Sequence, residues 1–296
     1  MTGYYPFQAE TRIPAEPAPE GSIDGQFHVF GPRETYPIRG EAAYEMPTAT
    51  FEAVRRMHKA LGITRGVVVQ STTYGTDHSA LLDALKAGDG AYKGCGVIND
   101  DVSDEYLQDL HDAGVRGARF NFLRVLKLTP TREASDRTVR RVSELGWYIK
   151  MQPAAEGLVQ DIDWFEGLDV PVVIDHLGRA EFGSEPGPNL RKLLQLTKRD
   201  NFWFMLSNGH KLSAQGAPYP DAQAVYARLA EAAPDRVIWA SDWPHPVSRS
   251  PVPNDADILE LLNASFPDPA LRRKVLIDNP ASLFGFPPSV ASKAVA

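Results

Sequence analysis

Residues 236–246 read Arg-Val-Ile-Trp-Ala-Ser-Asp-Trp-Pro-His-Pro. An apolar run that begins after a charged residue is typical of a buried parallel strand. This strand ends at Asp242, and the prolines that follow stiffen the turn behind it. Because α/β folds keep their chemistry at the carboxyl ends of strands, the stretch predicts a carboxylate at the mouth of a sheet or barrel. On this stretch alone, an aspartate that caps the next loop is the simpler interpretation.

Seven more strand candidates precede this stretch. They cover residues 21–30, 66–71, 95–98, 114–122, 147–152, 170–176 and 202–207. Segments with helical spacing alternate with them, and residues 157–165 are expected to be one such helix. No glycine-rich phosphate loop follows the first strand, which argues against an open doubly wound sheet. The pattern therefore predicts an α/β protein with a distorted TIM (β/α)₈ barrel.

Length, composition and charge limit the classes of protein to which this chain can belong. The chain has 296 residues, of which 43% are hydrophobic and 23% charged, so it is large enough for one barrel domain at 21–296 after a tail or arm at 1–20. Its net charge of −7 argues against nucleic-acid and membrane surfaces as partners. The single cysteine, Cys95, fits a reducing compartment. We expect a cytoplasmic monomer or small homo-oligomer with a small-molecule substrate and no membrane span.

Polar side chains end most of the predicted strands. Asp24, Gln26 and His28 alternate along the first strand and are expected to face one side. A barrel would bring the strand-end residues into one mouth. That set consists of Gln26, His28, Ser71, Arg119, Gln152, His176, Ser207 and Asp242.

A structural role is the alternative for each member of this set. Arg119 could pair with an internal acid such as Asp175 or Asp242, and His176 could be a hydrogen-bonded core residue. Four costly polar groups at equivalent strand ends are nevertheless hard to explain by packing alone. Those four, His28, Arg119, His176 and Asp242, favour a functional site.

A metal site is a second possibility at the same place. Two histidines and Asp242 match the two-histidine, one-carboxylate pattern. However, Gln26 stands where a further histidine ligand is wanted, and Arg119 is a cation that disfavours a second cation. The sequence therefore predicts no metal and no other cofactor.

Six segments together resemble a known family. They are residues 24–32, 67–71, 110–122, 173–179, 237–246 and 278–280. These segments are similar to the amidohydrolase superfamily, and most of all to its branch that holds 2-pyrone-4,6-dicarboxylate lactonase and D-galactarolactone isomerase. The resemblance covers the chain from Ser22 to Phe284. It implies a distorted (β/α)₈ barrel and an enzyme that acts on a lactone without a divalent metal.

The resemblance also implies roles for individual residues. Asp242 matches the acid that activates water, while His28 and His176 match histidines that polarise the lactone carbonyl. Gln26 replaces a histidine and is assigned to the same oxyanion group. The substrate-binding positions that it implies, with the nearest candidates where the match is incomplete, are Arg119, Lys211, Tyr44, Ser71, Arg124, Gln152 and His245.

Gln26 and Asp242 point to different reactions. Gln-x-His in the first strand is also the pattern of the isomerase, whereas Asp242 stands in place of the isomerase's asparagine. We therefore predict metal-independent hydrolysis of a carboxylated lactone of the 2-pyrone-4,6-dicarboxylate, muconolactone or sugar-acid type. A lactone isomerase, a metal-dependent amidohydrolase or decarboxylase, and a non-catalytic anion-binding barrel are the alternatives.

Overall fold

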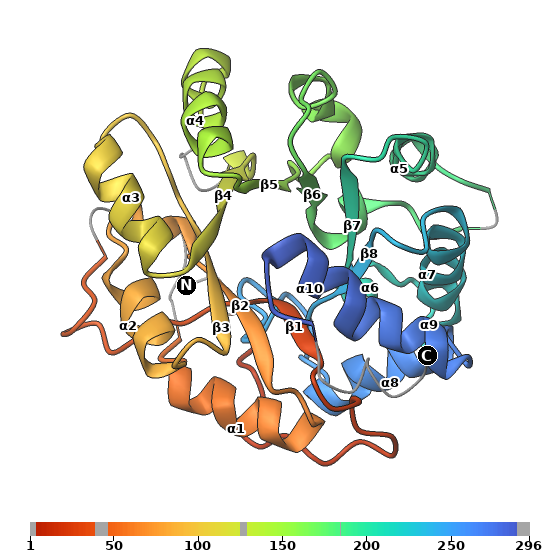
Figure 1. The fold of residues 1–296 in the computed structure, drawn as a ribbon. Helices are drawn as coiled ribbons and strands as arrows, with labels where there is room; N and C mark the ends of the chain where they lie inside the picture. Colours follow the sequence, from red (N-terminus) through yellow and green to blue (C-terminus); the bar gives the residue numbers. More distant parts are fainter. Residues whose placement is uncertain (1–3, 39–46, 125–128, 184, 289–296) are drawn as a thin grey trace.

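Eight parallel strands form one sheet in the order β1 to β8 (Figure 1). The structure is a computed structural model that describes residues 4–38, 47–124, 129–183 and 185–288. The predicted barrel is confirmed; most strands are shorter than the sequence indicated, and the strand expected at 95–98 begins earlier, at Tyr92. The strands are β1 (Ile23–Phe27), β2 (Arg65–Val69), β3 (Tyr92–Gly96), β4 (Val115–Asn121), β5 (Tyr148–Gln152), β6 (Val172–Ile174), β7 (Phe202–Leu206) and β8 (Val237–Trp239).

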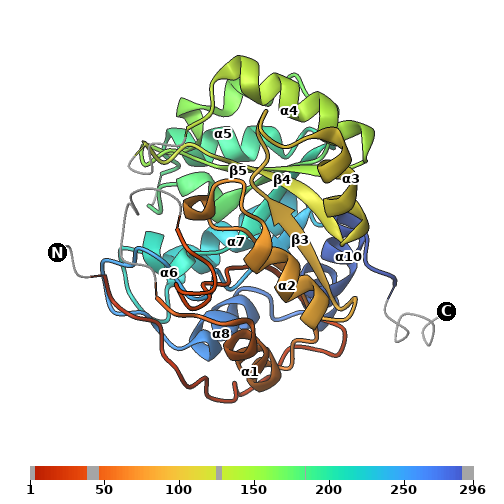
Figure 2. The same cartoon turned by 90° about the vertical axis from the view of Figure 1, so that its left-hand side faces the viewer.

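Most helices lie around the outside of the sheet (Figures 1 and 2). They are α1 (Phe51–Leu61), α2 (Ser79–Ala87), α3 (Asp104–Asp112), α4 (Arg132–Glu144), α5 (Pro188–Leu196), α6 (Gly209–Leu212), α7 (Pro220–Ala232), α8 (Asp255–Ser265), α9 (Pro269–Arg273) and α10 (Asn279–Phe284). Within the described chain, none of them is long and apolar enough to cross a membrane.

The connection between β5 and β6 departs from the prediction. The expected helix at 157–165 is replaced by two short 3₁₀ turns, Leu158–Gln160 and Ile162–Trp164. Gly157 has a φ of 103° and Asp161 a φ of −129°, so neither position continues an α-helix. Helical spacing alone did not reveal these two breaks.

The barrel closes where β1 meets the end of β8. Asp242 N donates to Gln26 O at 3.0 Å, and His28 N donates to Trp243 O at 2.8 Å. A Cβ atom on Gly25 would lie 2.8 Å from Trp239 O, so only glycine allows this close approach. Closure thus brings the ends of the first and last strands together.

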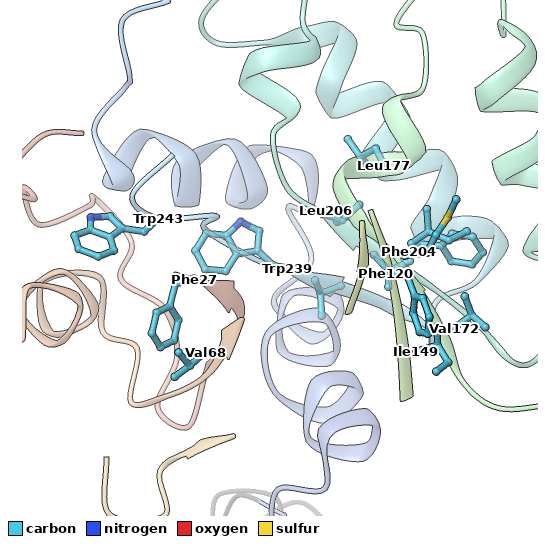
Figure 3. Packing of buried hydrophobic residues seen from close by; sticks show 14 of the residues in the cluster. Phe27, Val68, Phe120, Ile149, Val172, Leu177, Phe204, Leu206, Trp239 and Trp243 are labelled. Atoms are coloured by element: carbon cyan, nitrogen blue, oxygen red, sulfur yellow. The ribbon is translucent and has the colours of Figure 1, made fainter. Parts of the chain in front are cut away.

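Alternate residues on regular strands such as β2 pack inward and outward. Phe27 and Val68 are partners in the β1–β2 register and belong to the outer core shared with the helices (Figure 3). Val67 and Val69 belong to the inner core, which α10 extends through Phe284. Fully burying an apolar side chain of this size stabilises a fold by about 1.5–3 kcal/mol. Apolar side chains therefore fill the inside of the barrel below the cavity end.

A buried ion pair lies within the barrel. Lys150 Nζ is 2.5 Å from Asp175 Oδ1, and the two side chains are 1% and 0% exposed. Lys150 Nζ also donates to Met205 Sδ at 3.2 Å. Burial raises the pKa of Cys95 in the same inner core to about 11, so its thiol stays protonated near neutrality, as suits a small buried apolar residue.

Residues 4–20 form an arm along the last part of the barrel. Tyr5 N donates to Ser248 O at 3.0 Å, and the ring of Phe7 packs edge-on against Trp243 at 4.8 Å between centroids. Further along, Arg12 forms ion pairs with Asp257 and Glu260 on α8. The segment expected to be a tail or arm therefore packs on the loop after β8.

Candidate active site

A cavity of about 510 Å³ opens at the carboxyl ends of the strands. Most of the residues predicted for a site line it, and its described walls come mainly from the ends of β1, β2 and β4 to β8 and the segments after them. The predicted residues among its walls are His28, Ser71, Arg119, Gln152, His176, Lys211 and Asp242.

Asp242 is the most heavily contacted of these residues. Its Oδ1 accepts a hydrogen bond from Gln26 Nε2 at 2.8 Å and lies 3.4 Å from His28 Nε2. Its Oδ2 accepts from Asn208 Nδ2 at 2.9 Å and from Lys211 Nζ at 3.4 Å. The carboxylate is therefore held through both oxygens by groups from β1 and from the segment after β7.

His176 lies beside this carboxylate, and its two ring nitrogens have different neighbours. Its Nδ1 is 2.9 Å from Asn208 Nδ2, and the second hydrogen of that amide is needed for Asp242. Nδ1 also lies 2.8 Å from Ser207 Oγ, whose hydroxyl can donate or accept. The amide can only donate, so it favours the tautomer of neutral His176 that carries its proton on Nε2. That nitrogen is 3.9 Å from Asp242 Oδ1, so it has room to donate to a bound molecule.

His28 has the opposite arrangement. Its Nδ1 lies 2.7 Å from Val69 O, a carbonyl that can only accept, so Nδ1 carries a proton. Its Nε2 faces Asp242. The ring therefore contacts Val69 through one nitrogen and Asp242 through the other.

Burial and charge together fix the protonation states. Burial disfavours the Asp242 carboxylate, but His176, Lys211 and His28 outweigh it and hold the pKa of Asp242 well below its ordinary value. Burial lowers the pKa of His176 to about 4, against the pull of Asp242. Near neutrality Asp242 is therefore ionised and His176 is neutral.

The backbone at these strand ends is left-handed. His176, Asn208 and Asp242 have φ values of 49°, 58° and 60°. Such conformations cost about 1–3 kcal/mol each for residues other than glycine and concentrate at functional sites. At these positions they accompany the hydrogen-bonded network around Asp242.

Arg119 lies on β4 and is 8% exposed. Its Nη1 donates to Gln70 O at 2.8 Å, while its Nε is buried without a partner. Within the described residues no carboxylate pairs with it, and Asp175, one acid it could have paired with, binds Lys150 instead. The alternative of an internal Arg119–acid pair is therefore not what the described structure contains.

Several predicted positions lie elsewhere. Gln26 is fully buried behind Asp242 and does not line the cavity, because its amide is used to hold the carboxylate. His245 is also buried outside the lining, with Nε2 2.9 Å from Asp255 Oδ1. Arg124 is exposed and away from the cavity walls. Tyr44 lies outside the described residues.

Asp24 also departs from the expected common face. Its Oδ2 is 3.1 Å from His58 Nε2 on α1, and its Oδ1 accepts from Ser241 N. The β1–β2 register shifts between Asp24 and Phe27, which breaks the simple alternation of the strand. Asp24 therefore contacts α1 and Ser241 in the segment after β8, and it does not line the cavity.

The sequence analysis did not select three cavity residues that the structure brings into view. Asn208 directly follows β7 and bridges Asp242 and His176, while Asn121 ends β4 and donates to Thr72. Arg179 lies in the left-handed turn after His176. Their places at or just after strand ends were the available signal.

The side chains around Asp242 are poorly suited to bind a divalent metal ion. Gln26 and Asn208 already donate to Asp242, and the Lys211 ammonium lies 3.4 Å from the same carboxylate. A cation so close disfavours a second one. Among the residues that the structure describes, no three His, Cys, Asp or Glu side chains converge as ligands.

The sequence profile of the amidohydrolase family matches residues 23–286. The chain belongs to this family. It is 33% identical to the 2-pyrone-4,6-dicarboxylate hydrolase of Comamonas testosteroni, over 95% of this chain and 96% of the other. It is 35% identical to the 4-sulfomuconolactone hydrolase of Rhizobium radiobacter, over 90% and 91%. The D-galactarolactone isomerase of Agrobacterium fabrum is 28% identical, over 93% and 94%.

Two solved structures share the fold of this chain. An apo Agrobacterium tumefaciens protein superimposes with a TM-score of 0.82 at 28% identity and covers 93% of this chain and 100% of its own. A probable 2-pyrone-4,6-dicarboxylic acid hydrolase of Acinetobacter baumannii with citric acid bound has a TM-score of 0.78 at 28% identity, over 90% and 100%. The resemblance stated from the sequence is thereby confirmed.

Proposed function

We propose that this protein is a metal-independent lactonase that hydrolyses a carboxylated lactone of the 2-pyrone-4,6-dicarboxylate, muconolactone or sugar-acid type. The observation that carries the proposal is the Asp242 carboxylate, held beside two histidines in a cavity that also contains Arg119, with which no described carboxylate pairs. The two hydrolase relatives act on lactones by name, which supports the same reaction class.

In this reaction Asp242 accepts a proton from water, and the water oxygen forms a bond to the lactone carbonyl carbon. His176 donates from Nε2 to the carbonyl oxygen as negative charge develops there. When the intermediate collapses, the ring carbon–oxygen bond breaks and the leaving oxygen needs a proton. His28, with Nε2 3.4 Å from Asp242, can relay the proton that the carboxylate took from water.

Substrate binding itself adjusts the strength of the base. An aspartate with a very low pKa is a weak general base. A substrate carboxylate that pairs with Lys211 draws its ammonium away from Asp242, now 3.4 Å distant. The pKa of Asp242 then rises, because one of the charges that lowered it is neutralised. The base is thus strengthened when a suitable acid is bound.

The remaining cavity residues contact the substrate. Arg119 supplies a planar fork for a carboxylate, while Ser71 and Gln152 supply neutral polar groups. Tyr44 stays a prediction. Gln26 acts as a positioning residue for Asp242, in place of the oxyanion role expected from the sequence.

Direct identification of the product tests the proposal. Purified enzyme is incubated with a panel of carboxylated lactones, acid release is followed with a pH indicator, and the product is identified by NMR. An open-chain acid supports hydrolysis. Binding without turnover across the panel would favour the non-catalytic barrel.

A lactone isomerase is the second candidate, because Gln26 keeps the Gln-x-His pattern and one relative is a D-galactarolactone isomerase. In that reaction a substrate hydroxyl replaces water as the nucleophile. A ring-size isomer formed without net acid release would establish it.

A further inference from the structure

The arm that precedes the barrel contributes a side chain to the cavity. Tyr4 lines it, and its side chain is half-buried. Residues 246–250 of the loop after β8 also line the cavity, and Tyr5 N donates to Ser248 O of that loop at 3.0 Å. The rim on the β8 side is therefore built from two parts of the chain that are far apart in sequence, and the chemistry above does not use Tyr4.

The arm is fastened close to the general base. The ring of Phe7 packs edge-on against Trp243 at 4.8 Å between centroids. Trp243 is 1% exposed and directly follows Asp242. Together with the backbone bond of Tyr5, this ring contact gives Tyr4 a defined place at the edge of the cavity.

A second set of contacts holds the arm further along. Arg12 forms ion pairs with Asp257 and Glu260 on α8. The side chain of Asn254 accepts from Arg12 N at 3.2 Å and donates to Glu10 O at 2.9 Å. Terminal segments usually lack a fixed position unless such contacts tie them down, because ordering them costs conformational entropy. These contacts specify where the arm lies.

Tyr4 offers the cavity an aromatic surface. Phe30 also lines the cavity, but its side chain is fully buried and its ring lies against His28 and Tyr74. Among the described lining residues, Tyr4 is therefore the one whose six-membered ring has area left for a ligand to cover. A tyrosine ring packs well against a flat unsaturated ring and loses little entropy, since it has few rotatable bonds.

We propose that Tyr4 contacts the bound substrate and that the arm positions it there, so that the site favours ligands with a flat unsaturated ring over ligands with a saturated one. The inference rests on the proposed function in taking this cavity as the substrate site. Among the proposed substrates it favours pyrone-like and unsaturated lactones over sugar-acid lactones. Tyr4 is then a specificity residue, and Arg12 is a positioning residue that acts through it.

Equilibrium binding tests the contact without turnover. The probes are benzene-1,3-dicarboxylate and cis-cyclohexane-1,3-dicarboxylate, measured by titration calorimetry. They carry the same acidic groups on a flat ring and on a puckered ring, and neither has an ester bond. Tyr4→Ala should weaken the flat acid about 3- to 10-fold, as expected for the loss of one aromatic contact. It should change binding of the puckered acid by no more than about 2-fold.

The neighbouring tyrosine provides a matched control. Tyr5 is 48% exposed and does not line the cavity, and its backbone bond to Ser248 does not depend on its side chain. Tyr5→Ala should therefore bind both acids like the parent protein. Tyr4→Phe keeps the ring and should retain most of the binding of the flat acid, which also covers the case in which Tyr4→Ala disturbs the fold.

Arg12→Gln tests whether the arm acts through Tyr4. It removes the ion pairs with α8, so chymotrypsin should cut the arm faster at Tyr4 to Phe7, and the flat acid should bind about 2- to 3-fold more weakly. Once Tyr4 is an alanine, a loosened arm has nothing further to lose. The double variant should therefore bind the flat acid no more weakly than Tyr4→Ala alone.

The proposal is overturned if Tyr4→Ala binds the flat acid as Tyr5→Ala does, if it weakens both acids equally, or if the losses of Tyr4→Ala and Arg12→Gln add in the double variant. It is also overturned if the parent protein does not bind the flat acid. Absence of lactone hydrolysis would leave these binding results intact. Failure of the proposed function and failure of this inference are therefore distinguishable.

Discussion

The two sides of the cavity are built differently. On the side of β1, β6, β7 and β8, the polar groups bond to one another: Asp242 contacts Gln26, Asn208 and Lys211. On the side of β4 and β5, Arg119 and Gln152 lie on regular strands. Arg119 keeps a buried nitrogen without a partner.

The two sides of the cavity therefore suit two different tasks, catalysis on one side and anion recognition on the other. A group that must act on a reacting atom gains from being fixed beforehand, and mutual hydrogen bonds with left-handed backbone fix it. A group that recognises an anion gains from being unpaired until the ligand arrives. We therefore expect changes on the first side to alter kcat and changes on the second to alter KM.

Asp242→Asn should have the largest effect. It keeps the size of the side chain and removes the proton affinity that the general base needs, so kcat should drop by roughly 10²- to 10⁴-fold. Steady-state kinetics checks the drop, and circular dichroism checks that the fold is intact. Near-normal turnover would end the proposed role of Asp242.

Arg119→Lys should act on binding. Lysine keeps the charge but loses the rigid fork, and a charged hydrogen bond contributes about 1.5–3 kcal/mol. KM for a carboxylated lactone should rise about 10- to 100-fold while its neutral ester is hardly affected. Kinetics with the acid and the ester measure both changes. Equal losses for the two substrates would make Arg119 a structural residue.

Activity should fall in acid as His176 is protonated. Its pKa is lowered to about 4 by burial, so the neutral form persists from neutrality down to that pH. Below it, a protonated Nδ1 donates to Ser207 Oγ, 2.8 Å away, and no longer accepts the amide hydrogen of Asn208. The amide must turn, and its bond to Asp242 is lost. A kcat–pH profile with its acid limb near pH 6.5, the ordinary value for histidine, would contradict this.

Removal of metal ions by a chelator should have the smallest effect, because we expect it to leave the activity unchanged. Because Lys211 and the amides of Gln26 and Asn208 already satisfy Asp242, we expect full activity after dialysis against EDTA. Elemental analysis of the same sample should find no stoichiometric zinc. Activity lost to the chelator and restored by added zinc would move the protein to the metal-dependent alternative.

The strand pattern predicted the fold because parallel strands buried on both faces are continuous apolar runs, as around Ile238 and Val173. The same pattern predicted which side chains gather, since barrel strands end at one face. The pattern did not predict where side chains point once the chain has passed the last residue of a strand. His245 turns to Asp255, and Arg179 turns into the cavity through left-handed residues that no spacing rule encodes.

Local irregularity explains the other departures. The shifted register of β1 sends Asp24 to His58 and leaves Gln26 behind Asp242. Period-two alternation assumes an unbroken ladder, so a single irregularity reassigns the faces of every following residue.

The Lys150–Asp175 pair inside the barrel constrains how this sequence can evolve. Replacing either partner alone leaves an uncompensated buried charge and costs about 3–5 kcal/mol, whereas replacing both with apolar residues of similar volume is often neutral or stabilising. Asp175 also directly precedes His176, so this pair and the active-site turn are adjacent in the chain. In an alignment of relatives, positions 150 and 175 should therefore covary, changing together or not at all.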